Sequence, residues 1–199
     1  MILQQGNAFN VNEEDAKGAD SGQYITESCV EVGNIKKFLF ESTKNGAKFV
    51  SIDFETDSGA KANFMRIYYK NNDNSDNFAK KKLDALFCII DIKNAKYQER
   101  IVGGESEFYC PEAEDKRIAF SLQKEEYVKN DGGIGYKMNI MHSFYPDSMK
   151  TYSEKLDGKE AKTHLRKYED KLTKGDTGSG GSNQTSGAPV GGMDDMLPF

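Results

Sequence analysis

Apolar residues alternate with polar residues in five segments of this chain, and one segment with three-to-four apolar spacing lies between the third and the fourth of them. Alternation predicts strands with one buried face, whereas the wider spacing predicts an amphipathic helix. We therefore expect a mainly β fold, with strands at 29–41, 47–56, 60–70, 116–127 and 134–145. The expected helix is 77–92, with Ser75 or Asp76 as its N-cap and an apolar face of Phe78, Leu83, Leu86, Phe87 and Ile90.

The first predicted strand contains Gly33, and a glycine inside a strand indicates a bulge or a sharp bend. Asn45-Gly46 is a strong hairpin signal between the first two strands. A bent first strand, five strands in all and a helix between the third and the fourth are typical of an OB barrel. The sequence thus predicts a five-stranded OB-fold barrel over 28–149, and another small antiparallel α+β domain is the alternative.

The segments that flank this domain differ from it in composition. Residues 1–27 form an acidic arm, which is either loose or an edge strand, with one lysine against Glu13, Glu14, Asp15 and Asp20. Residues 150–174 are predicted to form a charged helix with a sparse apolar stripe of Leu156, Leu165, Tyr168 and Leu172. Residues 175–192 are rich in Gly, Ser, Asn and Thr, which predicts a flexible linker that leads to a tip at 193–199.

Composition argues against several functions. The net charge of −5 disfavours nonspecific duplex binding, and the run of roughly 20 apolar residues that a membrane span needs is missing. The N-terminus has no basic region before an apolar run, so we expect no signal peptide and a cytoplasmic protein. The chain has two histidines and no CxxC pair among Cys29, Cys88 and Cys110, which excludes a credible zinc site. We find no phosphate-binding loop or nucleophile motif and expect neither a cofactor nor an enzymatic activity.

The second and third predicted strands carry a candidate binding face. If Val50, Ile52, Met65 and Ile67 point into the core, the outer face holds Phe49, Phe64, Arg66 and Tyr68. Aromatic rings stack on the bases of single-stranded nucleic acid without requiring a sequence match, and an arginine can contact phosphate or a base. The lysines that we expect to follow the phosphate backbone are Lys36, Lys37, Lys44, Lys48, Lys61 and Lys70.

The acids of the second strand also suggest a nuclease. Asp53 and Glu55 resemble the first motif of the two-metal exonuclease family, and His142 and Asp147 have the spacing of its last motif. That last motif belongs on a helix, but here it lies at the end of a strand-like run, and Pro146 would remove a hydrogen bond if the segment were helical. That fold also needs several helices between these two motifs, and only one is predicted here. We therefore keep the exonuclease only as a minor alternative.

The sequence ends in MDDMLPF, after the linker and the predicted barrel. Consecutive acids, an apolar residue, Pro and Phe at the end of such a spacer resemble the tip of the bacterial single-stranded DNA-binding protein (SSB) family. The tip departs from that family by one acid fewer and by Met196. The barrel lacks the tryptophans of that family and is more similar to bacteriophage single-stranded DNA-binding proteins, through KANFMRIYYK and KKLDALF. The matching tip residues are Asp194, Asp195, Leu197, Pro198 and Phe199.

This resemblance implies a protein that coats and protects single-stranded DNA in phage replication, recombination or repair, in the cytoplasm of the bacterial host. It also implies that the tip docks on helicases, polymerase subunits or repair proteins. Phe199 would fill an apolar pocket there, while its carboxylate and the aspartates meet basic residues. A solvated acidic end without a partner is the simplest alternative for the tip. The functional alternative is an interaction adaptor that has such a tip but binds no DNA.

Overall fold

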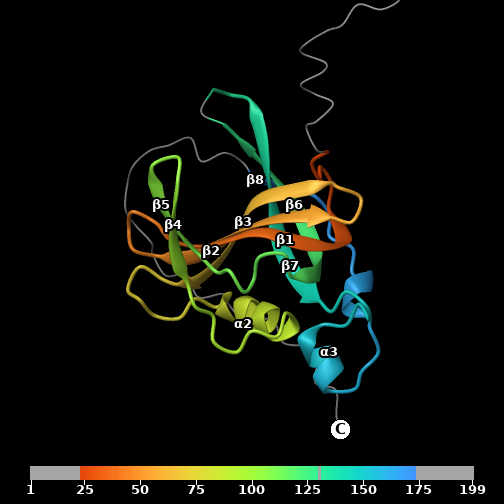
Figure 1. The fold of residues 1–199 in the computed structure, drawn as a ribbon. Helices are drawn as coiled ribbons and strands as arrows, with labels where there is room; N and C mark the ends of the chain where they lie inside the picture. The colour runs from red at the N-terminus through yellow and green to blue at the C-terminus, as the bar shows by residue number, and fades with distance from the viewer. Residues whose placement is uncertain (1–22, 130, 174–199) are drawn as a thin grey trace, which may run out of the picture.

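The computed structural model describes residues 23–129 and 131–173. The prediction of a mainly β fold is confirmed, because strands occupy each of the five predicted segments (Figure 1). Three further strands and three short helical segments are present in the described ranges. The strands are β1 (Cys29–Ser42), β2 (Lys48–Thr56), β3 (Lys61–Lys70), β4 (Gln98–Val102), β5 (Glu105–Tyr109), β6 (Arg117–Val128), β7 (Ile134–Phe144) and β8 (Lys171–Thr173). The helices are α2 (Lys80–Ile89), α3 (Tyr152–Leu156) and the 3-10 turn η1 (Thr163–Leu165).

Strand β1 joins the two parts of the sheet. Residues 33–42 pair antiparallel with β2, and residues 29–34 pair antiparallel with β6. Gly33 lies in both ladders, and a Cβ atom there would lie 2.1 Å from the Glu55 carbonyl oxygen, so only glycine fits. The bulge that Gly33 led us to expect is displaced toward the C-terminus, between Ile35 and Lys37. Strand β1 therefore bends and pairs with strands in both parts of the sheet.

The five long strands follow the order β3-β2-β1-β6-β7. The outer two, β3 and β7, also contact each other, although the ladder hydrogen bonds of β7 within the described chain go to β6. The inner faces of these strands enclose a core of aromatic and aliphatic side chains, among them Phe38, Phe54 and Phe120, all fully buried. The acidic arm contributes to this core, because Ile25 is buried beside the start of β3.

Helix α2 packs on β3 and β7 at one end of the sheet through Leu83, Leu86 and Ile89 (Figure 1). It begins later than expected, and Phe78 lies before it with 84 % of its surface exposed. Neither predicted N-cap is used. Asp76 forms an ion pair with Lys70 at 2.6 Å, and the Ser75 hydroxyl donates to Asp73 at 2.6 Å, so both side chains are held in the preceding loop. No helix in the described ranges is long and apolar enough to cross a membrane.

The structure differs from the prediction in two segments. Between the predicted helix and β6, where no element was predicted, lies the β4–β5 hairpin, whose turn uses Gly103 and Gly104 at positive φ. The charged helix predicted at 150–174 is reduced to α3, after which Gly158 at positive φ turns the chain toward η1 and β8. Leu156, Leu165 and Leu172 are exposed, so their spacing does not mark a buried helix face. The linker at 175–192 and the tip at 193–199 lie outside the described residues.

Candidate nucleic-acid interface

The predicted register of the outer face is confirmed. Phe49 lies opposite Tyr68, and Ser51 opposite Arg66, in the β2–β3 ladder. The alternate residues Val50, Ile52, Met65 and Ile67 are buried in the core. We define the outer face as the surface of β1–β3 that carries Lys37, Leu39, Glu41, Phe49, Ser51, Asp53, Phe64, Arg66 and Tyr68.

Phe49 is a support for its neighbours and not a stacking surface. Only 4 % of its surface is exposed, because the Arg66 guanidinium lies 4.7 Å from the centre of its ring and the Tyr68 ring packs at 5.1 Å. The prediction that Phe49 itself meets a base is therefore wrong. Its ring instead holds Arg66 and Tyr68 in place, and these two side chains keep contact with solvent.

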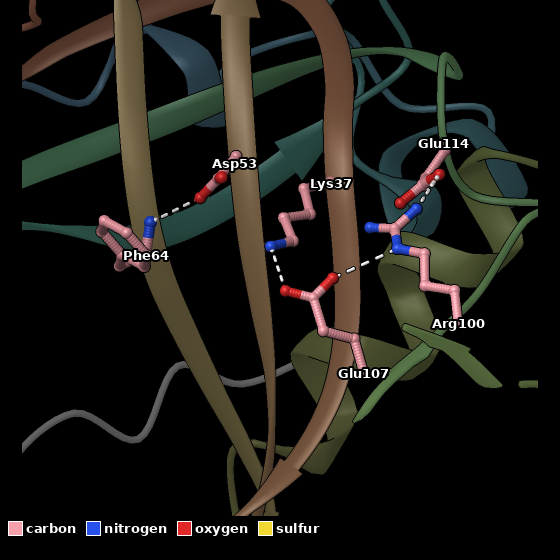
Figure 2. Close-up of polar contacts among 6 residues, drawn as sticks. All are labelled: Lys37, Asp53, Phe64, Arg100, Glu107 and Glu114. Atoms are coloured by element: carbon pink, nitrogen blue, oxygen red, sulfur yellow. Dashed lines mark hydrogen bonds and ion pairs between the residues drawn. The ribbon is translucent and has the colours of Figure 1, made fainter. Parts of the chain in front are cut away.

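Phe64 is the most exposed aromatic side chain of the outer face, with 70 % of its surface accessible. It lies in a β-bulge, because Asn63 and Phe64 together oppose the single residue Asp53. Its φ of 58° is in the left-handed region. The Phe64 backbone N–H donates to Asp53 Oδ1 at 2.8 Å (Figure 2). The bulge thus turns the ring away from the core that its neighbours enter.

A groove of about 600 Å³ separates Phe64, Arg66 and Tyr68 from the β6–β7 hairpin, which extends past the other long strands (Figure 1). Tyr127 and Tyr136 of this hairpin line the opposite wall, and each has 39 % of its surface exposed. The Tyr127 ring covers Gly135, where a Cβ atom would lie 2.8 Å from its Cζ. The sequence analysis named neither tyrosine as a binding residue, because it considered only the second and third predicted strands for the binding face.

The second flank of the outer face is the β4–β5 hairpin. Glu107 of β5 accepts from Lys37 Nζ at 2.6 Å and from Arg100 Nε at 3.1 Å, and Arg100 also contacts Glu114 at 3.1 Å (Figure 2). The Lys37 hydrogen bond and the Arg100 charge lower the pKa of Glu107. This chain of ion pairs fixes the hairpin to β1. Beside it, a second groove of about 510 Å³ is lined by rings of Phe40, Tyr69, Tyr97 and Phe108.

Most of the predicted lysines already have carboxylate partners. Lys44 and Lys48 are the exceptions: both are exposed, and neither forms an ion pair within the described residues. The partnered lysines are Lys36 with Asp115 at 3.2 Å, Lys37 with Glu107 at 2.6 Å, Lys61 with Glu55 at 3.8 Å and Lys70 with Asp76 at 2.6 Å. Aromatic surface, more than free positive charge, distinguishes the outer face.

The four residues of the nuclease alternative do not assemble into a site. Asp53 accepts the Phe64 N–H, and Glu55 lies 3.8 Å from Lys61. His142 is on β7, where burial lowers its pKa and its Nε2 lies 2.7 Å from the Tyr168 hydroxyl. Among the described residues, no group of three or more His, Cys, Asp or Glu side chains is placed to hold a metal ion. The arrangement gives a two-metal mechanism no support.

The predicted docking residues Asp194, Asp195, Leu197, Pro198 and Phe199 lie outside the described residues. Comparisons of the chain with protein-family models and with curated proteins found no match. The features that bear on function are therefore the geometry of the outer face and its groove, and the sequence of the tip.

Proposed function

We propose that this protein binds single-stranded DNA along the outer face, in the groove between β3 and the β6–β7 hairpin, and that it is not an enzyme. The observation that carries this proposal is a set of solvent-accessible rings on both walls of the groove: Phe64, Tyr127 and Tyr136, which are exposed, and Tyr68, which is half-buried. Each base stacked on such a ring is worth roughly 1–3 kcal/mol and needs no particular sequence. Duplex DNA hides the base faces, so the same rings favour single strands.

The arrangement of the five long strands supports an OB barrel as the scaffold. In sequence order these strands are the first to the fifth, and their spatial order is three-two-one-four-five, with the third in contact with the fifth. Helix α2 lies between the third and the fourth, as expected for this fold. Oligonucleotides bind OB folds on the face of strands two and three, beside the loop between strands four and five. The groove occupies the corresponding place.

We further propose that the protein coats and protects single strands in phage replication, recombination or repair, in the cytoplasm of the bacterial host. The 193–199 tip would recruit replication enzymes such as a helicase or a polymerase subunit. The tip sequence supports this part of the proposal, with its acids, Leu197, Pro198 and Phe199 behind a Gly/Ser-rich linker. Deletion of 193–199 should remove capture of these enzymes and leave binding of single-stranded DNA in place.

Fluorescence anisotropy with three labelled ligands tests the proposal. The ligands are oligothymidylate of about 16 nucleotides, a duplex of the same length and the corresponding RNA. Titrations at about 50 mM and about 200 mM salt separate stacking from phosphate contacts. We expect the oligothymidylate to bind more tightly than the duplex at both salt concentrations. No binding to any ligand would favour the adaptor, and magnesium-dependent loss of the oligonucleotide would reveal a nuclease.

A further inference from the structure

We infer that Asp53 is a positioning residue: its carboxylate holds the left-handed backbone of Phe64 and thereby presents the Phe64 ring to a base in the groove. This inference rests on the proposed function. Three features of the structure support it: the conformation of Phe64, the exposure of its ring, and the hydrogen bond from its backbone N–H to Asp53 Oδ1 at 2.8 Å.

The backbone conformation of Phe64 is unfavourable for folding alone. A φ of 58° suits glycine, and a bulky residue adopts it rarely because its Cβ approaches the backbone too closely. The ring gains little from burial in return, since 70 % of its surface is exposed. A strained residue that presents an apolar ring to solvent is more often found where a ligand binds than where a core is formed.

The hydrogen bond to Asp53 explains how the conformation persists. Asn63 and Phe64 share one partner position on β2, so the bulge turns the Phe64 amide out of the regular register. Asp53 is that partner position, and its carboxylate accepts the hydrogen bond from the Phe64 N–H. Without that acceptor, the amide would have to find another partner, and the bulge could relax toward a conformation that moves the ring.

The charges around Asp53 argue against a purely electrostatic role. Lys37, which lies opposite Asp53 in the β1–β2 ladder, pairs instead with Glu107 at 2.6 Å (Figure 2). The Asp53 carboxylate therefore remains directed at Phe64. A negative charge beside a phosphate-binding groove weakens phosphate attraction. An aspartate at position 53 is accounted for if the site requires its hydrogen-bond acceptor and not its charge.

Two substitutions separate these roles, with affinity for oligothymidylate as the measurement on the full chain. Asp53→Asn keeps an acceptor oxygen and removes the charge, so we expect it to bind as tightly as the wild type or more tightly. Asp53→Ala removes the same charge and also the acceptor. We expect its Kd for oligothymidylate to rise about 5-fold or more, which corresponds to the lower end of the stacking energy of one base. If Asp53→Ala does not fold, Asp53→Val removes the acceptor while keeping a strand-favouring residue.

Phe64→Gly tests the strain independently. Glycine adopts positive φ at no steric cost, so this variant should have a higher melting temperature than Phe64→Ala, while both bind oligothymidylate more weakly than the wild type. In the Phe64→Gly background, Asp53→Ala should weaken binding no further, because the ring that Asp53 positions is gone.

The outcomes distinguish the inference from the proposed function. If the wild type does not bind oligothymidylate, both fail. If the wild type binds and Phe64→Gly weakens it, but Asp53→Ala binds as tightly as Asp53→Asn, the groove is the binding site and Asp53 does not position the ring. Wild-type or tighter binding of oligothymidylate by Asp53→Asn, together with weaker binding by Asp53→Ala or Asp53→Val, supports the inference.

Discussion

Phe49 and Phe64 lie on the same face of neighbouring strands, yet their side chains have opposite surroundings. Phe49 is 4 % exposed beneath Arg66 and Tyr68, whereas Phe64 is 70 % exposed in the groove. We predict that Phe49→Ala lowers the free energy of unfolding by about 3 kcal/mol, because it leaves a cavity under two packed side chains. Urea denaturation measures this change. Phe78→Ala, at a site 84 % exposed, is the control and should change stability by less than about 0.5 kcal/mol.

Glu154 organises the segment after β7. Its side chain accepts from the Thr151 backbone N–H and from the N–H groups of Lys162 and Thr163, at 2.8 to 3.0 Å. Burial alone raises the pKa of this carboxyl group, but these hydrogen bonds outweigh burial and lower the pKa to about 2. One ionised side chain thus replaces part of the regular structure that a longer helix would have provided at 150–174.

The depressed pKa of Glu154 predicts a pH dependence of stability. Because its folded-state pKa lies below the ordinary value of 4.5, its ionised form stabilises the fold above about pH 4.5, and this contribution is lost as pH falls toward about 2. The contribution is on the order of 3 kcal/mol. Unfolding experiments between these pH values should give a steeper loss of stability for the wild type than for Glu154→Gln. Parallel curves for the two proteins would show that Glu154 is not the responsible group.

At the scale of elements, strand alternation predicted all five long strands, because each has one face in the core and the other outside it. The β4–β5 hairpin was missed although Gly103-Gly104 is a two-residue turn signal; its strands have few buried residues, so the alternation is weak. The charged helix was predicted from sparse leucines, and Gly158 at positive φ was the signal that it ends early.

The binding groove could be predicted only in part. The β3 wall followed from register, whereas Tyr127 and Tyr136 lie where the β6–β7 hairpin extends beyond the core. There Tyr136, which has the same strand parity as the buried Met138 and Ile140, meets solvent, and no local pattern marks the position where a strand leaves the core. The exposure of Phe64 depends on a bulge that adds one residue opposite Asp53, and strand alternation does not indicate such an addition.

The β4–β5 hairpin depends on Arg100, whose guanidinium reaches Glu107 and Glu114 together. Lysine keeps the charge but cannot reproduce this fork, so Arg100→Lys should loosen the hairpin. We predict that amide exchange at residues 98–109 becomes about 10-fold faster, which corresponds to about 1.4 kcal/mol of local stability. Arg117→Lys, which disturbs the exposed pair with Asp57, is the matched control and should leave exchange in the hairpin unchanged. Equal exchange in Arg100→Lys and wild type would contradict the role of Arg100.

At the scale of the whole molecule, the net charge is −5, and of the six lysines predicted to follow the phosphate backbone only Lys44 and Lys48 have no ion pair within the described residues. Affinity should therefore depend on salt mainly through cations such as Lys44 and Lys48. Each phosphate contact on a single strand contributes about 0.7 to the slope of log affinity against log salt, so Lys44→Gln with Lys48→Gln should reduce the slope by about 1.4. The pair Lys36→Gln and Lys61→Gln removes the same charge from ion-paired positions and should reduce it less. An equal reduction in both would mean that net charge, not location, sets the salt dependence.

The central claim is that single-stranded DNA lies on the rings of the groove. Affinity for one labelled oligothymidylate, compared among wild type, Phe64→Ala, Tyr68→Ala and Phe78→Ala, tests it most directly, since Phe64 and Phe78 are both exposed phenylalanines and only Phe64 lines the groove. We expect Phe64→Ala and Tyr68→Ala each to weaken binding by roughly 1–3 kcal/mol, with an unchanged melting temperature for Phe64→Ala, and Phe78→Ala to bind like the wild type. Wild-type affinity in both groove variants, or an equal loss in Phe78→Ala, would contradict the claim.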